Sequence, residues 1–94
     1  MNAGYDKQGI ERIRATLKEI KVAAGQLVVD TRYNAKEKAA MLNGLKQAVD
    51  NLGVMICNMG GDPFEVMAAV RCSQYLIACI ADLKMEGDES DEDN

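Results

Sequence analysis

Four basic side chains on one face of a predicted helix are the clearest candidates for binding chemistry in this sequence. Lys7, Arg14, Lys18 and Lys21 fall within about 60° of one another when residues are placed 100° apart around a helix. This basic stripe borders an apolar seam, so its cations meet either phosphates or the acidic side chains of a partner helix. The alternative is an ordinary solvated helix face. With few aromatic residues interleaved, the stripe is a weak signal for nucleic-acid binding.

The second candidate is an acidic cluster at the C-terminus. It comprises five carboxylates, Asp88, Glu89, Asp91, Glu92 and Asp93. Such a segment can occupy the basic stripe, in the same chain or from a second subunit, or imitate a nucleic-acid backbone toward a basic partner. It can equally act as a solubilising tail. It lacks the glycine and the terminal glutamate of an EF-hand loop, so we predict no calcium site.

Side chains suited to catalysis or metal binding are scarce. The chain has no histidine, which removes the usual general base and the commonest metal ligand. Cys57, Cys72 and Cys79 form no CxxC pair, and we interpret them as reduced thiols that serve as small apolar core residues. Gly60-Gly61 precedes a predicted helix but lacks the lysine of a phosphate-binding loop. We therefore predict no catalytic residues, no cofactor and no metal.

Charge is distributed unevenly along the 94 residues. The whole chain has a net charge of −4, whereas residues 1–87 carry eleven basic and ten acidic groups, a net charge of +1. Residues 1–46 carry nine basic and five acidic groups, a net charge of +4. The chain shows no apolar segment typical of a secretory signal and no run of about 20 apolar residues. We therefore expect a cytoplasmic protein with no membrane partner.

Three periodic segments position these residues. Apolar side chains spaced alternately three and four residues apart predict helices over about 7–29 and 35–59. Asp62, Pro63 and Glu65 predict the start of a third helix over 63–86, because they form an N-cap with proline at the first helical position. The apolar residues of this third helix fill about half its circumference, wide enough to pack against two neighbours at once.

Short links between the three helices predict an all-α, antiparallel three-helix bundle with coiled-coil-like seams. Residues 1–86 form the helical domain, and residues 87–94 a disordered acidic tail. On the second predicted helix, Ala40, Gly44 and Ala48 form a flat strip that another helix could approach closely. A dimer that completes its core with a second copy fits this pattern as well as a monomer does.

Taken together, these features predict a small non-enzymatic interaction protein. It would act as an adaptor, accessory protein or inhibitor by binding another protein or itself, and we expect a homodimer or higher oligomer. The alternative is a nucleic-acid-associated accessory protein that uses the basic stripe, or one whose acidic tail mimics nucleic acid.

Overall fold

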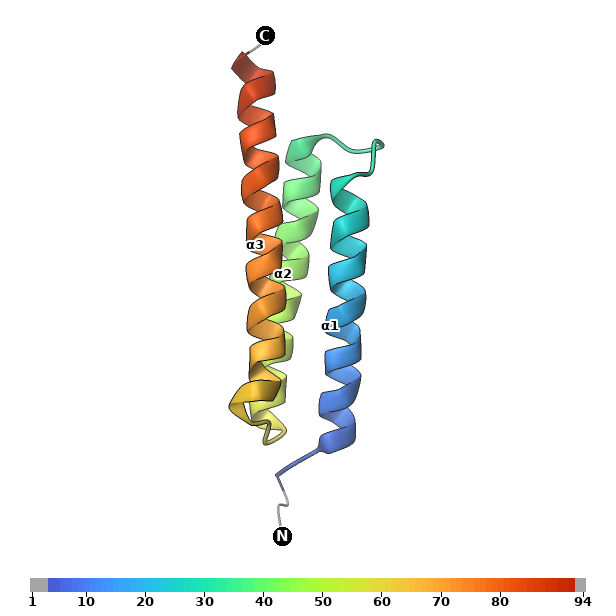
Figure 1. Ribbon diagram of the computed structural model, residues 1–94, viewed down its shortest axis with the longest axis vertical. Helices are drawn as coiled ribbons and strands as arrows, with labels where there is room; N and C mark the ends of the chain where they lie inside the picture. Colours follow the sequence, from blue (N-terminus) through green and yellow to red (C-terminus); the bar gives the residue numbers. More distant parts are fainter. Residues whose placement is uncertain (1–3, 93–94) are drawn as a thin grey trace.

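The computed structural model describes residues 4–92 and the side chains of residues 4–85. Within this part of the chain it has three helices and no strand: α1 (Lys7–Val28), α2 (Ala35–Asn58) and α3 (Pro63–Glu92). The helices run up, down and up in one bundle, so that α1 and α3 are parallel (Figure 1). The predicted all-α three-helix bundle is confirmed.

Capping side chains set where the helices begin. Asp6 Oδ1 accepts a hydrogen bond of 2.9 Å from a backbone N–H in the first turn of α1. Asn34 and Glu37 exchange side-chain and backbone hydrogen bonds at the start of α2, and Asp62 and Glu65 do the same at the start of α3. Each reciprocal pair satisfies two N–H groups that would otherwise lack a partner. The predicted starts at residues 7, 35 and 63 are therefore confirmed.

The two turns have distinct causes. Gly60 has a φ of 80°, a left-handed conformation that glycine adopts without strain, and it ends α2. At the other end of the bundle, Lys38 Nζ donates a 2.8 Å hydrogen bond to the carbonyl oxygen of Val28 and so caps the last turn of α1. Asp30 and Arg32 form an ion pair of 2.6 Å within the same turn.

The core is aliphatic and extends along the bundle. Its buried members come from the apolar seams of α1 and α2 and from the apolar arc of α3: Ile10, Ile13, Leu17, Ala24, Leu42, Val49, Ile56, Ala69, Cys72, Leu76 and Leu83. Among the residues described, no polar or charged side chain is buried. Burial of a large aliphatic side chain contributes about 1.5–3 kcal/mol, so this continuous seam holds the three helices together.

Small residues allow α2 and α3 to pack closely. A Cβ atom placed on Gly53 would lie 3.2 Å from the Cβ atom of Ala69. The strip of Ala40, Gly44 and Ala48 lies on the outer side of α2, because the apolar seam of this helix faces α1 and α3. All three residues are exposed, and a Cβ atom on Gly44 would meet nothing within 4 Å. Neither α1 nor α3, as far as the structure describes them, uses the strip for close approach.

The C-terminal end of α3 projects beyond both other helices (Figure 1). Its backbone is helical to Glu92, where the sequence predicted a helix that ends at residue 86 and a disordered tail. Packing fixes α3 as far as Leu83, and extending an existing helix costs far less than starting one. A single glycine, Gly87, weakens the extension by about 1 kcal/mol without ending it. Residues 93–94, which include Asp93, lie outside the described residues.

Helix α3 is also long and apolar enough, over Pro63–Met85, to cross a membrane by length and composition, with a mean hydropathy of 1.4. The sequence analysis had predicted no such segment. The bundle gives these apolar residues another use, because Ala69, Cys72 and Leu76 pack in its core. Arg71 lies near the middle of the segment, and an arginine at the centre of a bilayer costs about 2.5–3.5 kcal/mol or more.

Candidate functional site

Two exposed surfaces lie on opposite flanks of α3. An apolar groove runs beside α2, and a cationic face runs beside α1. Val70 belongs to the groove and Tyr75 to the cationic face, and the two residues lie about 140° apart around the helix axis. Each surface can therefore be altered without changing the other.

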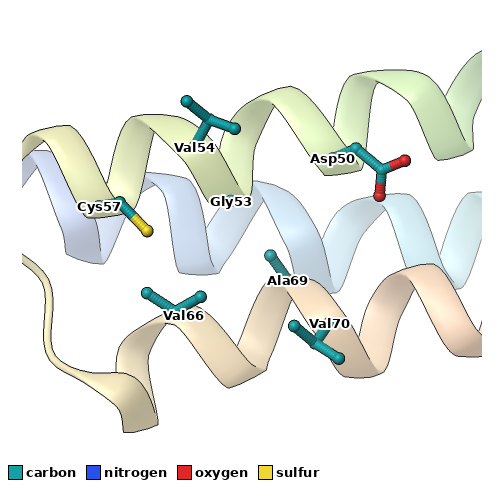
Figure 2. A pocket seen from close by; sticks show the side chains of 7 residues that line it. All are labelled: Asp50, Gly53, Val54, Cys57, Val66, Ala69 and Val70. Carbon is teal, nitrogen blue, oxygen red and sulfur yellow. The ribbon is translucent and has the colours of Figure 1, made fainter.

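The apolar groove is a hollow of about 250 Å³ between α2 and α3. Its lining residues are Asp50, Gly53, Val54 and Cys57 of α2, with Val66, Ala69 and Val70 of α3. Figure 2 shows these side chains on the two facing helices, with α1 behind them on the far side of the groove. The close approach of Gly53 and Ala69 forms its floor, because neither residue has a side chain that could fill it.

The walls of the groove expose aliphatic side chains that the core does not use. Val54 is 59% exposed and Val70 is 38% exposed. Ile77, which is 49% exposed, follows Val70 by two helical turns and extends the same flank of α3. The wide apolar arc predicted on α3 is therefore only partly covered by α1 and α2. Its remaining edge faces solvent.

Among the described residues, Asp50 is the only charged one that lines the groove, and Lys46 neutralises its charge. Its carboxylate accepts a 2.9 Å hydrogen bond from Lys46 Nζ and a 3.0 Å hydrogen bond from Ser73 Oγ on α3. The hydrogen bond from Lys46 is the main cause that lowers the pKa of Asp50, and the bond from Ser73 adds to it. The groove therefore carries no net charge, and its polar groups are already satisfied.

The basic stripe predicted on α1 is fully on the surface. Its four residues, Lys7, Arg14, Lys18 and Lys21, are all exposed. None of them forms an ion pair with another described residue, since the two ion pairs found there are Arg32–Asp30 and Lys46–Asp50. Lys7 lies about two turns before Arg14, the nearest of the other three, at the end of the bundle where Tyr5 donates a hydrogen bond to Glu65. The compact part of the stripe is therefore Arg14, Lys18 and Lys21.

Helix α3 adds residues to this stripe that the sequence analysis did not assign to it. The ammonium group of Lys21 lies 5.5 Å from the centre of the Tyr75 ring. A Cβ atom on Gly25 would lie 3.2 Å from the Tyr75 hydroxyl, so Tyr75 rests against α1. Arg71 and Phe64 precede Tyr75 by four and eleven residues, which places them within about 40° and 20° of it around α3. The i, i+4 and i, i+11 spacing was visible in the sequence, but not the helix that it would face.

Together these residues form the cationic face, defined as Arg14, Lys18 and Lys21 of α1 with Phe64, Arg71 and Tyr75 of α3. Phe64 is 86% exposed, and Tyr75 is partly exposed beside Lys21. The electrostatic interaction with Cys79 is the main cause that raises the pKa of Tyr75, and burial adds to it. Two exposed acids lie near these residues. Asp82 follows Tyr75 by two turns of α3, and Glu11 precedes Arg14 by about one turn of α1, level with the segment between Phe64 and Arg71.

The acidic residues of the C-terminal segment are carried away from this face. The Cys72 thiol lies 3.6 Å from the carbonyl oxygen of Leu17, which sets these two positions level in the parallel pair α1 and α3. Lys21 is thus level with Leu76, and Asp88 lies about 18 Å further along the continuous α3. We conclude that residues 88–92 do not fold back onto the stripe within one chain while α3 stays helical.

No family model, curated protein or solved structure matches this chain. Within the described residues, no group of three or more histidine, cysteine, aspartate or glutamate side chains is placed to hold a metal ion. Both surfaces are open and shallow, whereas small-molecule sites are concave and enclose most of their ligand. Neither surface therefore has the enclosed shape of a typical small-molecule site.

Proposed function

We propose that this chain is a non-enzymatic interaction protein that associates with a second copy of itself through the apolar groove. The observation that carries this proposal is the row of exposed aliphatic side chains along the groove, Val54, Val70 and Ile77. This row continues the core, but none of the three described helices covers it. Covering such a row removes apolar surface from water, at about 25 cal/mol for each Å².

Charge supports an identical partner. Asp50 is neutralised by Lys46, so two copies of the groove meet without the repulsion that like charges would cause. A basic or acidic partner, by contrast, would find no complementary charge here. The groove is also narrow and lined by small residues, which suits the exposed valine and isoleucine side chains of a second copy.

In the proposed dimer, α2 and α3 of both copies enclose a second apolar core of four helices. The two α1 helices lie outside this core, so the cationic face of each copy stays exposed. The symmetric pairing is closed, which limits the assembly to two copies. The dimer can then serve as an adaptor or accessory protein, because the cationic face of each copy remains free to contact another molecule.

A matched pair of valine substitutions tests this proposal. Val54 lies in the groove and is 59% exposed, and Val22 lies on the outer side of α1 and is 61% exposed. We expect Val54→Glu to convert the dimer to a monomer, because it places an unpaired charge in the interface. We expect Val22→Glu, which adds the same charge, to leave the dimer intact. Light scattering at about 50 μM protein measures the mass, and circular dichroism verifies that both variants stay helical.

Two results would contradict the proposal. One is a dimer that survives Val54→Glu, which would place the interface elsewhere on the bundle. The other is dissociation by both substitutions to the same extent, which would attribute association to general charge effects instead of the groove.

A further inference from the structure

Beyond self-association, we propose that the cationic face binds single-stranded nucleic acid, with phosphates on its four cations and bases stacked on its exposed aromatic rings. The juxtaposition that carries this inference is a line of cations from α1 beside a line of Phe64, Arg71 and Tyr75 on α3. Neither helix holds this combination alone.

The cations are placed to follow a phosphate backbone. Arg14, Lys18 and Lys21 span seven residues of α1, a length of about 10 Å. Arg71 lies one turn before Tyr75, and Tyr75 is beside Lys21, so Arg71 is level with the middle of this row. Four positive charges within two or three turns of helix create a field that attracts a polyanion, in a region where no described ion pair neutralises them.

The aromatic rings distinguish nucleic acid from other polyanions. Phe64 is 86% exposed, although a phenylalanine is costly to leave in water, and it lies about 16 Å from Tyr75 along α3. Stacking of a base on such a ring is favourable whatever the base, and it requires a base that is not already stacked in a duplex. An acidic peptide or a sulfated sugar carries no planar base that could stack on these rings in this way.

Lys21 links the two kinds of contact. Its ammonium group lies over the Tyr75 ring at 5.5 Å. This cation–π contact is worth only about 0.5–1 kcal/mol at an exposed site, so an incoming base can displace it. The displaced ammonium group is then free to reach the neighbouring phosphate. Asp82 lies two turns beyond Tyr75 on the same side of α3 and limits the bound strand at that end by repulsion.

The cationic face lies on the flank of α3 opposite to the apolar groove. Binding of nucleic acid therefore does not depend on the proposed dimer, and each proposal can fail without the other. In a dimer both faces would point outward from the four-helix core.

The test measures binding of the full-length protein to a fluorescently labelled single-stranded DNA of about 20 nucleotides, by anisotropy in about 50 mM salt. We expect saturable binding. The logarithm of its association constant should fall linearly with the logarithm of the salt concentration, with a slope of about −3, since each of four neutralised phosphates on a single strand contributes about 0.7. We expect the duplex of the same sequence to bind at least ten-fold more weakly, because its bases cannot reach the rings.

Two triple variants, matched for charge, locate the site. Replacement of Lys18, Lys21 and Arg71 with glutamine removes three charges from the face, and we expect at least a ten-fold loss of affinity. Replacement of Arg12, Lys36 and Lys84 with glutamine removes three exposed charges from elsewhere, and we expect less than a three-fold loss. Equal losses in the two variants would overturn the assignment, because general electrostatic attraction would then explain the binding.

A second pair of variants tests the stacking. Tyr75→Phe keeps the ring, and we expect it to bind as the unmodified protein does. Tyr75→Leu keeps apolar bulk without the ring, and we expect about a ten-fold loss. Equal binding by these two variants, tight binding of the duplex, or preference for an acidic peptide of residues 86–94 over the DNA would each overturn the proposal. Absence of any binding in low salt would overturn it outright.

Discussion

Cys57 and Cys72 occupy opposite environments. Cys57 is exposed in the groove, whereas Cys72 is 1% exposed and its thiol lies 3.6 Å from the carbonyl oxygen of Leu17. Burial raises the pKa of the Cys72 thiol, and the nearby charge of Lys21 only partly opposes this shift. Because the thiolate is the reactive species, burial and the raised pKa both protect Cys72 from modification.

We therefore expect iodoacetamide at pH 8 to modify Cys57 within minutes and Cys72 only after the chain unfolds. Mass spectrometry of the modified peptides measures both rates, at a protein concentration below 1 μM so that self-association does not cover Cys57. Rapid modification of Cys72 in native buffer would show that its packing differs from this account.

The ion pair between Asp30 and Arg32 gives a prediction about pH. Hydrogen bonds from the Arg32 side chain and backbone lower the pKa of Asp30 to about 2. A carboxyl group whose pKa falls on folding stabilises the fold above its unfolded pKa near 4 and loses this contribution as the pH falls toward 2. We expect Arg32→Gln to raise the pKa of Asp30 toward its ordinary value of 3.8, as measured by NMR titration of its carboxyl carbon. An unchanged pKa near 2 would assign the shift to the backbone N–H of the turn.

At the scale of the helices, Gly44 and Gly53 of α2 are expected to respond in opposite ways to substitution. A Cβ atom on Gly44 has open space around it, whereas one on Gly53 meets the Cβ atom of Ala69 at 3.2 Å. Glycine inside a helix costs about 0.5–1 kcal/mol relative to alanine. We expect Gly44→Ala to stabilise the protein by this amount in urea unfolding. We expect Gly53→Ala to show no gain, because α2 and α3 must separate slightly to admit the methyl group. A gain of similar size at both positions would contradict the close packing of α2 on α3.

The helices show which features a sequence of this kind determines locally. Caps depend on residues three positions apart, and the reciprocal pair of Asp62 and Glu65 was therefore predictable with its helix start. The contact of Tyr75 with Gly25 depends on the register between two helices, which a periodic seam does not specify. For this reason the basic stripe was predicted, but its extension by Arg71 and Tyr75 was not. Helix α3 also continues past the predicted residue 86 to Glu92, because no proline or cap marks an end there and continuation of a packed helix costs little.

At the scale of the whole molecule, the acidic segment beyond Glu86 controls net charge more than stability. A chain that ends at Glu86 loses five carboxylates and changes net charge from −4 to +1, while the buried core ends at Leu83. We expect thermal unfolding to change little and binding of single-stranded DNA in low salt to strengthen several-fold. The gain should disappear at a few hundred millimolar salt, where the Debye length is about 5 Å. A large drop in thermal stability would show that the segment packs on the bundle, and unchanged DNA binding would show that it does not influence the cationic face.

The central claim is that an identical chain covers the apolar groove between α2 and α3. Sedimentation equilibrium of the unmodified protein, over about 1–200 μM and in physiological salt, tests it most directly. We expect the weight-average mass to rise with concentration and level off at twice the 10.2 kDa of the single chain, because two copies close the assembly. A mass of 10.2 kDa that stays constant across this range would contradict the claim. It would show that Val54, Val70 and Ile77 stay exposed to solvent and are not covered by a second copy.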